Sequence, residues 1–174
     1  MSGSADGIVV REIAPSEHER LGEITVAAYL GIEGVGEDSE YLEELRDVTA
    51  RAAQVPVLVA VEGSSGQVLG GVAFIPGPGP LAEMEAPDEA GIRMLAVAPE
   101  AQSRGIGRAL VEACVARARA AGKRRVVLLT MPTMTAAHRL YLSLGFERDT
   151  ANDWEYEPGR HLWGFALDLA PDAA

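Results

Sequence analysis

A short loop with two glycines is the part of the sequence best suited to bind an anion. It reads Gln102-Ser103-Arg104-Gly105-Ile106-Gly107 and leads into a segment with helical spacing of apolar residues. Gly105 and Gly107 remove side chains where backbone amides must face an anion, and the helix that begins there adds the positive end of its dipole. Arg104 and Arg108 flank the loop and can neutralise phosphate charge. This spacing favours a pyrophosphate site, although the third glycine of a dinucleotide-binding fingerprint is absent. The alternative is that the two glycines serve an ordinary tight turn.

The net charge of −11 is distributed unevenly along the chain. Residues 93–148, which include the loop, carry 10 basic and 3 acidic side chains, whereas the stretches on both sides are strongly acidic. An acidic chain repels nucleic acid, so we expect no nucleic-acid partner. The basic stretch can hold a phosphorylated small molecule while the acidic stretches attract a cation. The alternative is that these charges only solvate helix faces.

Length and composition indicate one globular domain. The chain has 174 residues, of which 48% are hydrophobic, and a single core fits this length. We expect a flexible N-terminus over residues 1–7 and one domain over residues 8–170. The one cysteine, Cys114, cannot form an internal disulfide, the first residues do not resemble a signal peptide, and no apolar stretch reaches the roughly 20 residues that span a bilayer. We therefore expect a cytoplasmic protein with no membrane partner.

The elements that must position the loop can be predicted from periodicity. In the first half we expect a strand over residues 8–13, a helix from Pro15 onwards and a second helix from 38 or 39 to 53. A hairpin of two strands should follow, over residues 57–61 and 67–75. In the second half we expect helices over residues 105–121 and 134–144. The strands around them should cover residues 92–98, 126–130, 146–148 and 161–169. A strand, a helix and a strand in succession predict a right-handed parallel crossover joined to antiparallel hairpins.

Two motifs in the second half carry a resemblance to a known family. The loop matches the Gln/Arg-x-x-Gly-x-Gly/Ala pattern of the GNAT superfamily of N-acetyltransferases, and residues 137–146 resemble its Ala-x-x-Leu-Tyr-x-x-x-Gly-Phe helix. The motifs span residues 92–148, and the predicted element order extends the likeness to nearly the whole chain. The resemblance implies an α/β (α+β) fold, with a mixed, mostly antiparallel central sheet, about four flanking helices and a parallel β-α-β crossover at the coenzyme site.

The resemblance also implies acetyl-CoA as cosubstrate. Its pyrophosphate would be held by the loop amides, and its pantetheine arm would pair with the end of the strand before the loop, much as an added strand pairs with a sheet edge. No metal is expected, because His18, His138 and His161 lack zinc-ligand spacing. The predicted cofactor-binding residues are Leu95, Ala96, Val97, Gln102, Ser103, Arg104, Gly105, Ile106, Gly107, Arg108 and Ala137.

Acetyl transfer to an amine needs a base for the nitrogen and an acid for the leaving thiolate. In similar proteins the tyrosine at the position of Tyr141 lies close to the coenzyme sulfur, so Tyr141 is the predicted acid. The alternative is a tyrosine packed between helix and sheet with a locally satisfied hydroxyl. We interpret Cys114 as a core residue and His138 as a solvated helix histidine rather than a proton relay.

The base is harder to predict. Some relatives have a glutamate on the strand before the loop, and the matching position here is Gly91. Glu89 lies two residues earlier, on the same face of an extended strand, and is the predicted substitute. The alternative is that it is a solvated carboxylate like Glu83, Glu85 and Asp88. Catalysis through a water chain or by an already neutral amine also stays open.

The acceptor is expected to be a cationic primary amine, in a small molecule or a peptide. Acceptor sites of the superfamily usually lie between the first two helices and the late hairpin, where this chain is acidic at Glu33, Glu37, Asp38, Glu40, Glu43, Glu44, Asp149, Asp153, Glu155 and Glu157. Aromatic faces could add to cation binding, from Tyr29, Tyr41, Trp154, Tyr156 and Trp163. The alternative is that these residues serve solubility and packing.

Two functions are compatible with these features. The first is an N-acetyltransferase that acts by direct attack in a ternary complex. The second is a non-catalytic acyl-CoA sensor on the same scaffold, which Gly91 favours. Tyr141 together with the intact loop favours the transferase more, because a sensor needs no proton donor beside the sulfur, so we expect an enzyme. The tail resembles a late loop of bacterial members. Dimers are frequent among similar proteins, so the resemblance is compatible with a homodimer and leaves the oligomeric state open.

Overall fold

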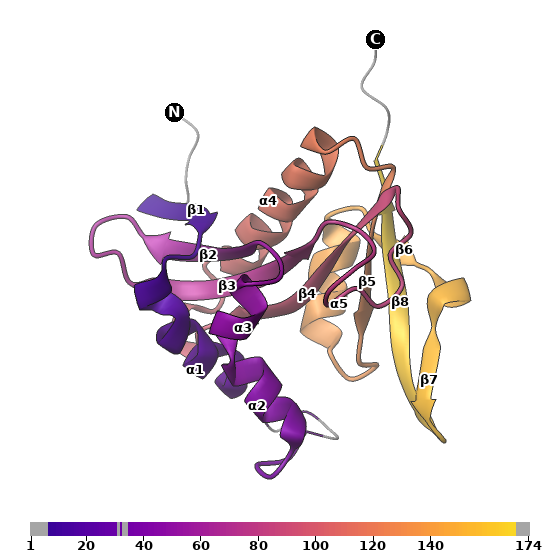
Figure 1. Cartoon of the computed structure of the whole chain (residues 1–174), viewed down its shortest axis with the longest axis horizontal. Coiled ribbons are helices and arrows are strands. Elements are labelled where there is room, and N and C mark those ends of the chain that lie inside the picture. Colours follow the sequence, from indigo (N-terminus) through magenta and orange to yellow (C-terminus); the bar gives the residue numbers. More distant parts are fainter. Residues whose placement is uncertain (1–6, 31, 33–34, 170–174) are drawn as a thin grey trace. The chain divides into compact units, whose positions relative to one another are not determined.

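The structure is a computed structural model that describes residues 7–30, 32 and 35–169 (Figure 1). Most of the predicted flexible terminus, residues 1–6, and Glu33 of the acidic set lie outside the described residues. The elements in chain order are β1 (Ile8–Glu12), η2 (Pro15–Glu17), α1 (His18–Tyr29), α2 (Glu40–Arg46), α3 (Val48–Ala52), β2 (Val57–Glu62), β3 (Val68–Ile75), β4 (Glu89–Val97), η3 (Pro99–Ala101), α4 (Ile106–Ala120), β5 (Arg125–Thr130), α5 (Thr135–Ser143), β6 (Glu147–Arg148), η4 (Thr150–Asn152), β7 (Trp154–Glu157) and β8 (Arg160–Asp168).

The chain divides into two compact units that are interleaved in sequence. The first unit combines the chain up to Phe74 with residues Met94–Ala113, and the second combines Ile75–Arg93 with the chain from Cys114 onwards. Strand β4 and helix α4 therefore each contribute to both units. The single domain over residues 8–170 stays a prediction.

None of the helices in the described ranges combines the length and the apolar character needed to cross a membrane.

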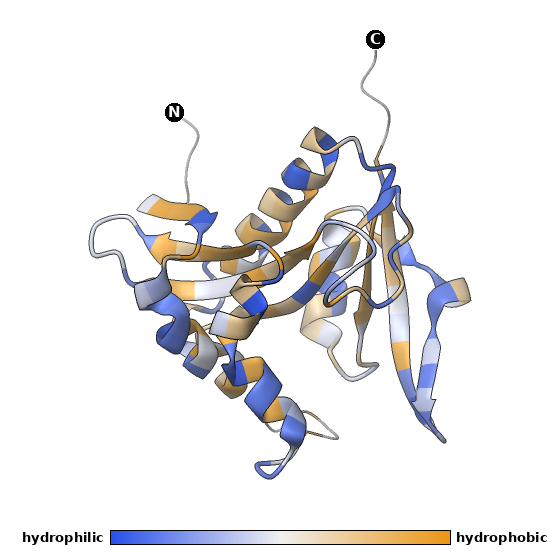
Figure 2. Cartoon of the chain, in the orientation of Figure 1, coloured by the Kyte–Doolittle hydropathy of each residue, from blue (hydrophilic) through white to orange (hydrophobic). Residues whose placement is uncertain are grey.

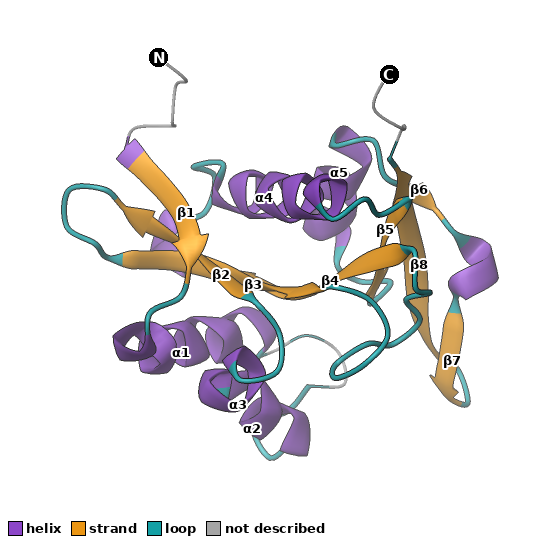
Figure 3. Ribbon diagram, turned by 45° about the horizontal axis from the view of Figure 1, so that its top comes forward, coloured by secondary structure: helices purple, strands orange, loops and turns teal. Residues whose placement is uncertain are grey.

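In the first unit, β1, β2 and β3 form an antiparallel sheet that carries helices on both faces (Figure 3). Strands β2 and β3 are almost entirely hydrophobic and buried (Figure 2). A Cβ at Gly71 would contact Leu21 of α1, and one at the preceding Gly70 would contact Ile106 of α4. Because successive residues of a strand face opposite sides, α1 covers one face and the start of α4 covers the other.

The second predicted helix is divided into α2 and α3. Asp47 lies between them with φ −81° and ψ 71°, outside the helical region. Its carboxylate accepts a hydrogen bond from Ala50 N at 3.0 Å and so caps a new helix. The apolar spacing continues through the break, which is why periodicity predicts one helix where the structure has two.

The second unit contains the parallel strand pair. Strand β4 pairs with β5 in parallel, with Glu89 opposite Arg125 and Gly91 opposite Val127, and β5 pairs with β8 in antiparallel. Strands β6 and β7 also pair with β8 in antiparallel. The mixed, mostly antiparallel pairing and the crossover through α4 are as predicted. Strand β4 begins three residues earlier than expected, and β7 was not predicted.

Candidate active site

In the first unit, the loop between η3 and α4 has the backbone geometry that anion binding requires. Ser103 and Gly105 have positive φ angles of 68° and 77°. Left-handed residues among right-handed ones turn successive N–H groups toward one point, which forms a concave anion site. Gly105 O accepts from Ala109 N at 3.0 Å, so helix α4 starts within the loop and its dipole points at the same place. These residues fit the pyrophosphate of acetyl-CoA through backbone groups.

The two flanking arginines already have carboxylate partners. Arg104 Nη2 lies 3.1 Å from Glu62 Oε2, and Arg108 Nη1 lies 3.4 Å from Glu112 Oε1. Both pairs are substantially exposed, and such pairs contribute little stability, so an incoming phosphate can compete for either guanidinium. The loop amides therefore carry most of the anion site.

The end of β4, before the loop, has an irregular backbone. Met94 has a φ of 55°, which a non-glycine residue in a strand adopts only at a bulge or under strain. A bulge at this position would interrupt regular pairing and release backbone groups for the predicted pairing with the pantetheine arm. Leu95 and Val97 are half-buried while Ala96 is buried, and a Cβ at Gly70 of β3 would lie 2.6 Å from Ala96 O.

In the second unit, Tyr141 of α5 is enclosed by aromatic rings. Its ring centroid lies 5.5 Å from that of Phe146 and 6.1 Å from that of Phe165, and 4% of the residue is exposed. Burial, followed by the nearby Cys114 thiol, raises the pKa of Tyr141. No described residue forms a hydrogen bond with its hydroxyl. A tyrosine that serves only for packing would have its hydroxyl hydrogen-bonded to a nearby group. The surroundings of Tyr141 are therefore compatible with its predicted role as proton donor. Ala137 lies one turn earlier on the same helix face.

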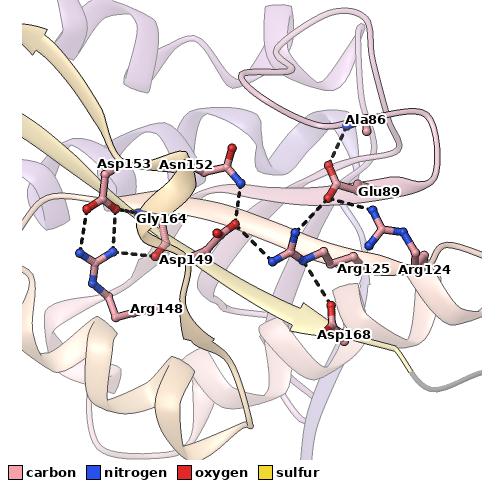
Figure 4. A network of polar contacts seen from close by, with 10 residues as sticks. All are labelled: Ala86, Glu89, Arg124, Arg125, Arg148, Asp149, Asn152, Asp153, Gly164 and Asp168. Atoms are coloured by element: carbon pink, nitrogen blue, oxygen red, sulfur yellow. Dashed lines mark hydrogen bonds and ion pairs between the residues drawn. The ribbon is translucent and has the colours of Figure 1, made fainter.

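Glu89 belongs to an extended polar network (Figure 4). Its carboxylate accepts from Ala86 N at 2.9 Å and lies 3.6 Å from both Arg124 Nη2 and Arg125 Nη1. Arg125 also contacts Asp149 and Asp168, each at 3.3 Å. The two guanidiniums lie against Oε2 and the Ala86 N–H group occupies Oε1, so both oxygens already have partners. Glu89 as a base stays a prediction, and this environment favours a structural role.

Sequence reasoning did not single out Glu85. Like Glu83 and Asp88 it was expected to be a solvated loop carboxylate, but the structure leaves only 8% of it exposed. A Cβ at Gly91 would overlap with its Oε1 atom. The sequence feature that could have pointed to this contact is Gly91, because a glycine on a buried strand face leaves space for another group.

The expectation for His138 is wrong and that for Cys114 is confirmed. His138 is 9% exposed, its Nε2 lies 2.8 Å from Thr130 Oγ1, and its ring stacks on Trp163 at a centroid distance of 5.5 Å. Burial lowers the pKa of His138. Cys114 is fully buried, and burial raises the pKa of its thiol to about 12.

The predicted acidic residues differ in how they are compensated. In the tail, Asp149 contacts Arg125 at 3.3 Å and Asp153 contacts Arg148 at 2.7 Å. The bond to Arg148 lowers the pKa of Asp153. The ring of Trp163 is likewise covered by Arg148, whose guanidinium lies 4.6 Å from its centroid. On and before α2, by contrast, five carboxylates are exposed and have no basic partner among the described residues: Glu37, Asp38, Glu40, Glu43 and Glu44.

Within the described residues, no group of three or more His, Cys, Asp and Glu side chains could hold a metal ion.

The match to a known family covers most of the chain. The model of the Acetyltransferase (GNAT) family matches residues 19–146, which include β4, the loop and α5. The chain therefore belongs to the GNAT acetyltransferase family, and it is an acetyl-CoA-dependent acetyltransferase. No curated protein matches the sequence significantly.

Solved structures share the fold along nearly the whole chain. A GNAT family acetyltransferase from Brucella melitensis in complex with acetyl-CoA is 26% identical, with a TM-score of 0.63, and the match covers 97% of this chain and 92% of that one. A GCN5-related N-acetyltransferase from Kribbella flavida is 24% identical, with a TM-score of 0.70 and coverage of 95% and 100%. A ribosomal-protein-alanine N-acetyltransferase from Brucella melitensis is 22% identical, with a TM-score of 0.68 and coverage of 92% and 99%.

Proposed function

We propose that this acetyltransferase moves the acetyl group of acetyl-CoA to a primary amine by direct attack in a ternary complex. The acceptor is a cationic small molecule or a basic peptide amine. Acetyl-CoA supplies an activated thioester carbonyl. The nitrogen of the acceptor forms a C–N bond with that carbon, the C–S bond breaks, and the products are an amide and free CoA.

The burial of Cys114 carries the direct-attack proposal. An acetyl-enzyme intermediate needs an accessible nucleophile, most readily a thiolate. The chain has one cysteine, and it is fully buried with its pKa raised to about 12. The thiol can neither reach a substrate nor ionise near neutral pH, which favours direct transfer over a covalent relay.

The proposed roles follow from the local environments. The amides of residues 102–108 hold the pyrophosphate, and Leu95, Ala96 and Val97 present backbone groups to the pantetheine arm. Tyr141 donates a proton to the departing thiolate, since a phenol with a raised pKa stays protonated throughout the neutral range. Ala137, on the same face of α5 and without a bulky side chain, leaves room beside the coenzyme.

The uncompensated carboxylates on and before α2 support a cationic acceptor. Exposed acidic groups without basic partners create a negative potential that attracts cations and is weakened by salt. The tail carboxylates add less, because Arg125 and Arg148 neutralise Asp149 and Asp153. A cytoplasmic location and a homodimer stay predictions.

Initial-rate kinetics test the order of events. With both substrates varied, a ternary complex gives intersecting double-reciprocal lines, whereas an acetyl-enzyme gives parallel lines. We expect intersecting lines, and no gain in protein mass after incubation with acetyl-CoA alone. Parallel lines together with an acetylated protein would refute direct attack.

A further inference from the structure

Glu85 is a buried carboxylate to which the roles above give no task. Its Oε2 accepts hydrogen bonds from the backbone N–H groups of Glu83 at 2.8 Å and Met84 at 3.0 Å. Neither bond involves Oε1. No arginine or lysine among the described residues pairs with this carboxylate. Buried carboxylates are normally paired with a cation, so an unpaired one needs a reason.

The neighbouring glutamates are neutralised, which sets Glu85 apart. Glu83 Oε1 lies 2.5 Å from Arg93 Nε, and Glu89 lies between Arg124 and Arg125. Of these three carboxylates on one short stretch of chain, Glu85 alone has no basic partner among the described residues, and its Oε1 accepts no hydrogen bond from them. That oxygen also keeps some solvent access, because the only fully enclosed and unpartnered side-chain atom in the described part of the chain is Arg125 Nε. Oε1 can therefore reach an entering molecule.

The absence of a side chain at Gly91 places the Glu85 carboxylate on the face of β4. The three atoms nearest to a Cβ at Gly91 are Oε1, Cδ and Cγ of Glu85. The carboxylate thus fills the space that a side chain of residue 91 would occupy. Gly91 and Arg93 share this face because strand side chains alternate. Arg93 fixes the loop there through Glu83 and through a hydrogen bond of 3.3 Å to Leu81 O.

We propose that Glu85 is the general base of the acetyl transfer and that Gly91 makes room for it. A loop residue then delivers to β4 the carboxylate that the strand itself lacks, while Glu89 holds the fold. This assignment rests on the proposed transfer to a primary amine.

The step balances with Glu85 as proton acceptor. The neutral amine attacks the thioester carbon, and its nitrogen becomes strongly acidic as the C–N bond forms. Oε1 of Glu85 takes the nitrogen proton, the C–S bond breaks, and the thiolate takes the proton that Tyr141 donates. The two backbone N–H groups on Oε2 fix the carboxylate in one orientation throughout, as preorganised general bases require.

The test compares four variants with the wild-type protein. Glu85→Gln keeps the shape of the side chain and removes the base, and Asp88→Asn is the matched control on an exposed carboxylate of the same segment. Glu85→Ala empties the space over Gly91, and the double variant Glu85→Ala/Gly91→Glu refills it with a carboxylate from the strand. Each protein is assayed for thiol release with a primary amine and for acetyl-CoA binding by calorimetry.

We expect Glu85→Gln to lower kcat by about 100-fold or more, the usual contribution of a general base, with acetyl-CoA affinity unchanged. Asp88→Asn should stay within about 3-fold of wild type, because an exposed ion pair contributes little. Glu85→Ala/Gly91→Glu should recover part of the rate that Glu85→Ala loses, which a merely structural role would not produce. If wild type is active and Glu85→Gln is equally active, or if the double variant recovers nothing, the base assignment is wrong. If wild type itself releases no thiol with any amine, the proposed function is what fails.

Discussion

Tyr141 shows how the environment of one residue determines its chemistry. Its ring is held by Phe146 and Phe165, and burial raises the pKa of its hydroxyl, which has no hydrogen-bond partner among the described residues. Such a group stays protonated at neutral pH. It can therefore donate a proton to the thiolate, an anion that appears only during the reaction. An interaction made only with the transition state accelerates the reaction, whereas one made equally with the bound substrate does not.

Tyr141→Phe isolates this donor. The change removes one oxygen that has no hydrogen bond to lose and keeps the ring contacts, so the protein should fold normally. We expect kcat to fall by about 100-fold, the typical size of a general-acid contribution. Acetyl-CoA affinity, measured by calorimetry, should not change. Unchanged turnover would remove the acid role from Tyr141.

His138 gives a prediction for stability. Because burial lowers its folded-state pKa below the unfolded value of about 6.5, the unfolded chain binds the proton more tightly. The contribution of this residue to the free energy of unfolding is complete above pH 6.5 and is lost as the pH falls from there through the folded-state pKa. The melting temperature should therefore drop between pH 7.5 and 5.5.

Histidine variants assign that drop to a residue. His138→Gln should show a smaller change in melting temperature between the two pH values, even if it is less stable at both. His161→Gln, at an exposed histidine of β8, should keep the wild-type pH dependence. An equal pH dependence in wild type and His138→Gln would contradict the interpretation.

At this scale, residue type and spacing could predict part of the candidate site. The glycine positions of the loop and the tyrosine of α5 could be recognised because they belong to continuous motifs. Gly91 could be seen to lack a side chain, but Glu85 could not be seen to fill its place. That contact depends on the path of an irregular Pro- and Gly-containing segment, in which Leu81 has a positive φ of 64°. His138 of α5 was placed in solvent because its partners, Thr130 of β5 and Trp163 of β8, lie on strands distant from it in the sequence.

Among the elements, helix α4 is the one that defines the proposed coenzyme site. Its first turn presents free N–H groups because Gly105 begins the helix with a positive φ and carries no side chain. Because backbone groups form this arrangement, we expect acetyl-CoA affinity to fall when a side chain is introduced into the first turn of α4.

Gly107→Glu tests this element. A carboxylate there would oppose a phosphate, and two like charges about 4 Å apart at an effective dielectric constant of about 20 repel by about 4 kcal/mol. We expect acetyl-CoA affinity to fall by at least 100-fold in calorimetry. Ala116→Glu adds the same charge at an exposed position further along α4 and should leave affinity unchanged. Intact binding in Gly107→Glu would refute the loop assignment.

Element boundaries reveal a second limit of sequence reasoning. Periodicity correctly predicted β2, β3, α4 and β5, whose apolar patterns are long or bounded by glycine. It merged α2 and α3 because the capping of Ala50 N by Asp47 leaves the apolar spacing intact. It missed β7, whose four residues are all exposed and therefore carry no burial pattern.

Across the whole molecule, charge is the property that bears most on the acceptor. The net charge is −11, and five carboxylates on and before α2 have no basic partner among the described residues. Screening at physiological salt limits such a field to about 8 Å. If it guides the acceptor, the apparent KM for a cationic amine should rise with ionic strength while kcat stays constant.

The most direct test of the account is thiol release from acetyl-CoA with a panel of acceptors. The panel contains polyamines, aminoglycosides and basic peptides, with neutral and anionic amino compounds as controls. We predict release with cationic primary amines and an ionic-strength dependence confined to them. Release only with neutral or anionic compounds would contradict the charge argument, and no release with any primary amine, while acetyl-CoA binding is confirmed by calorimetry, would contradict the transfer itself.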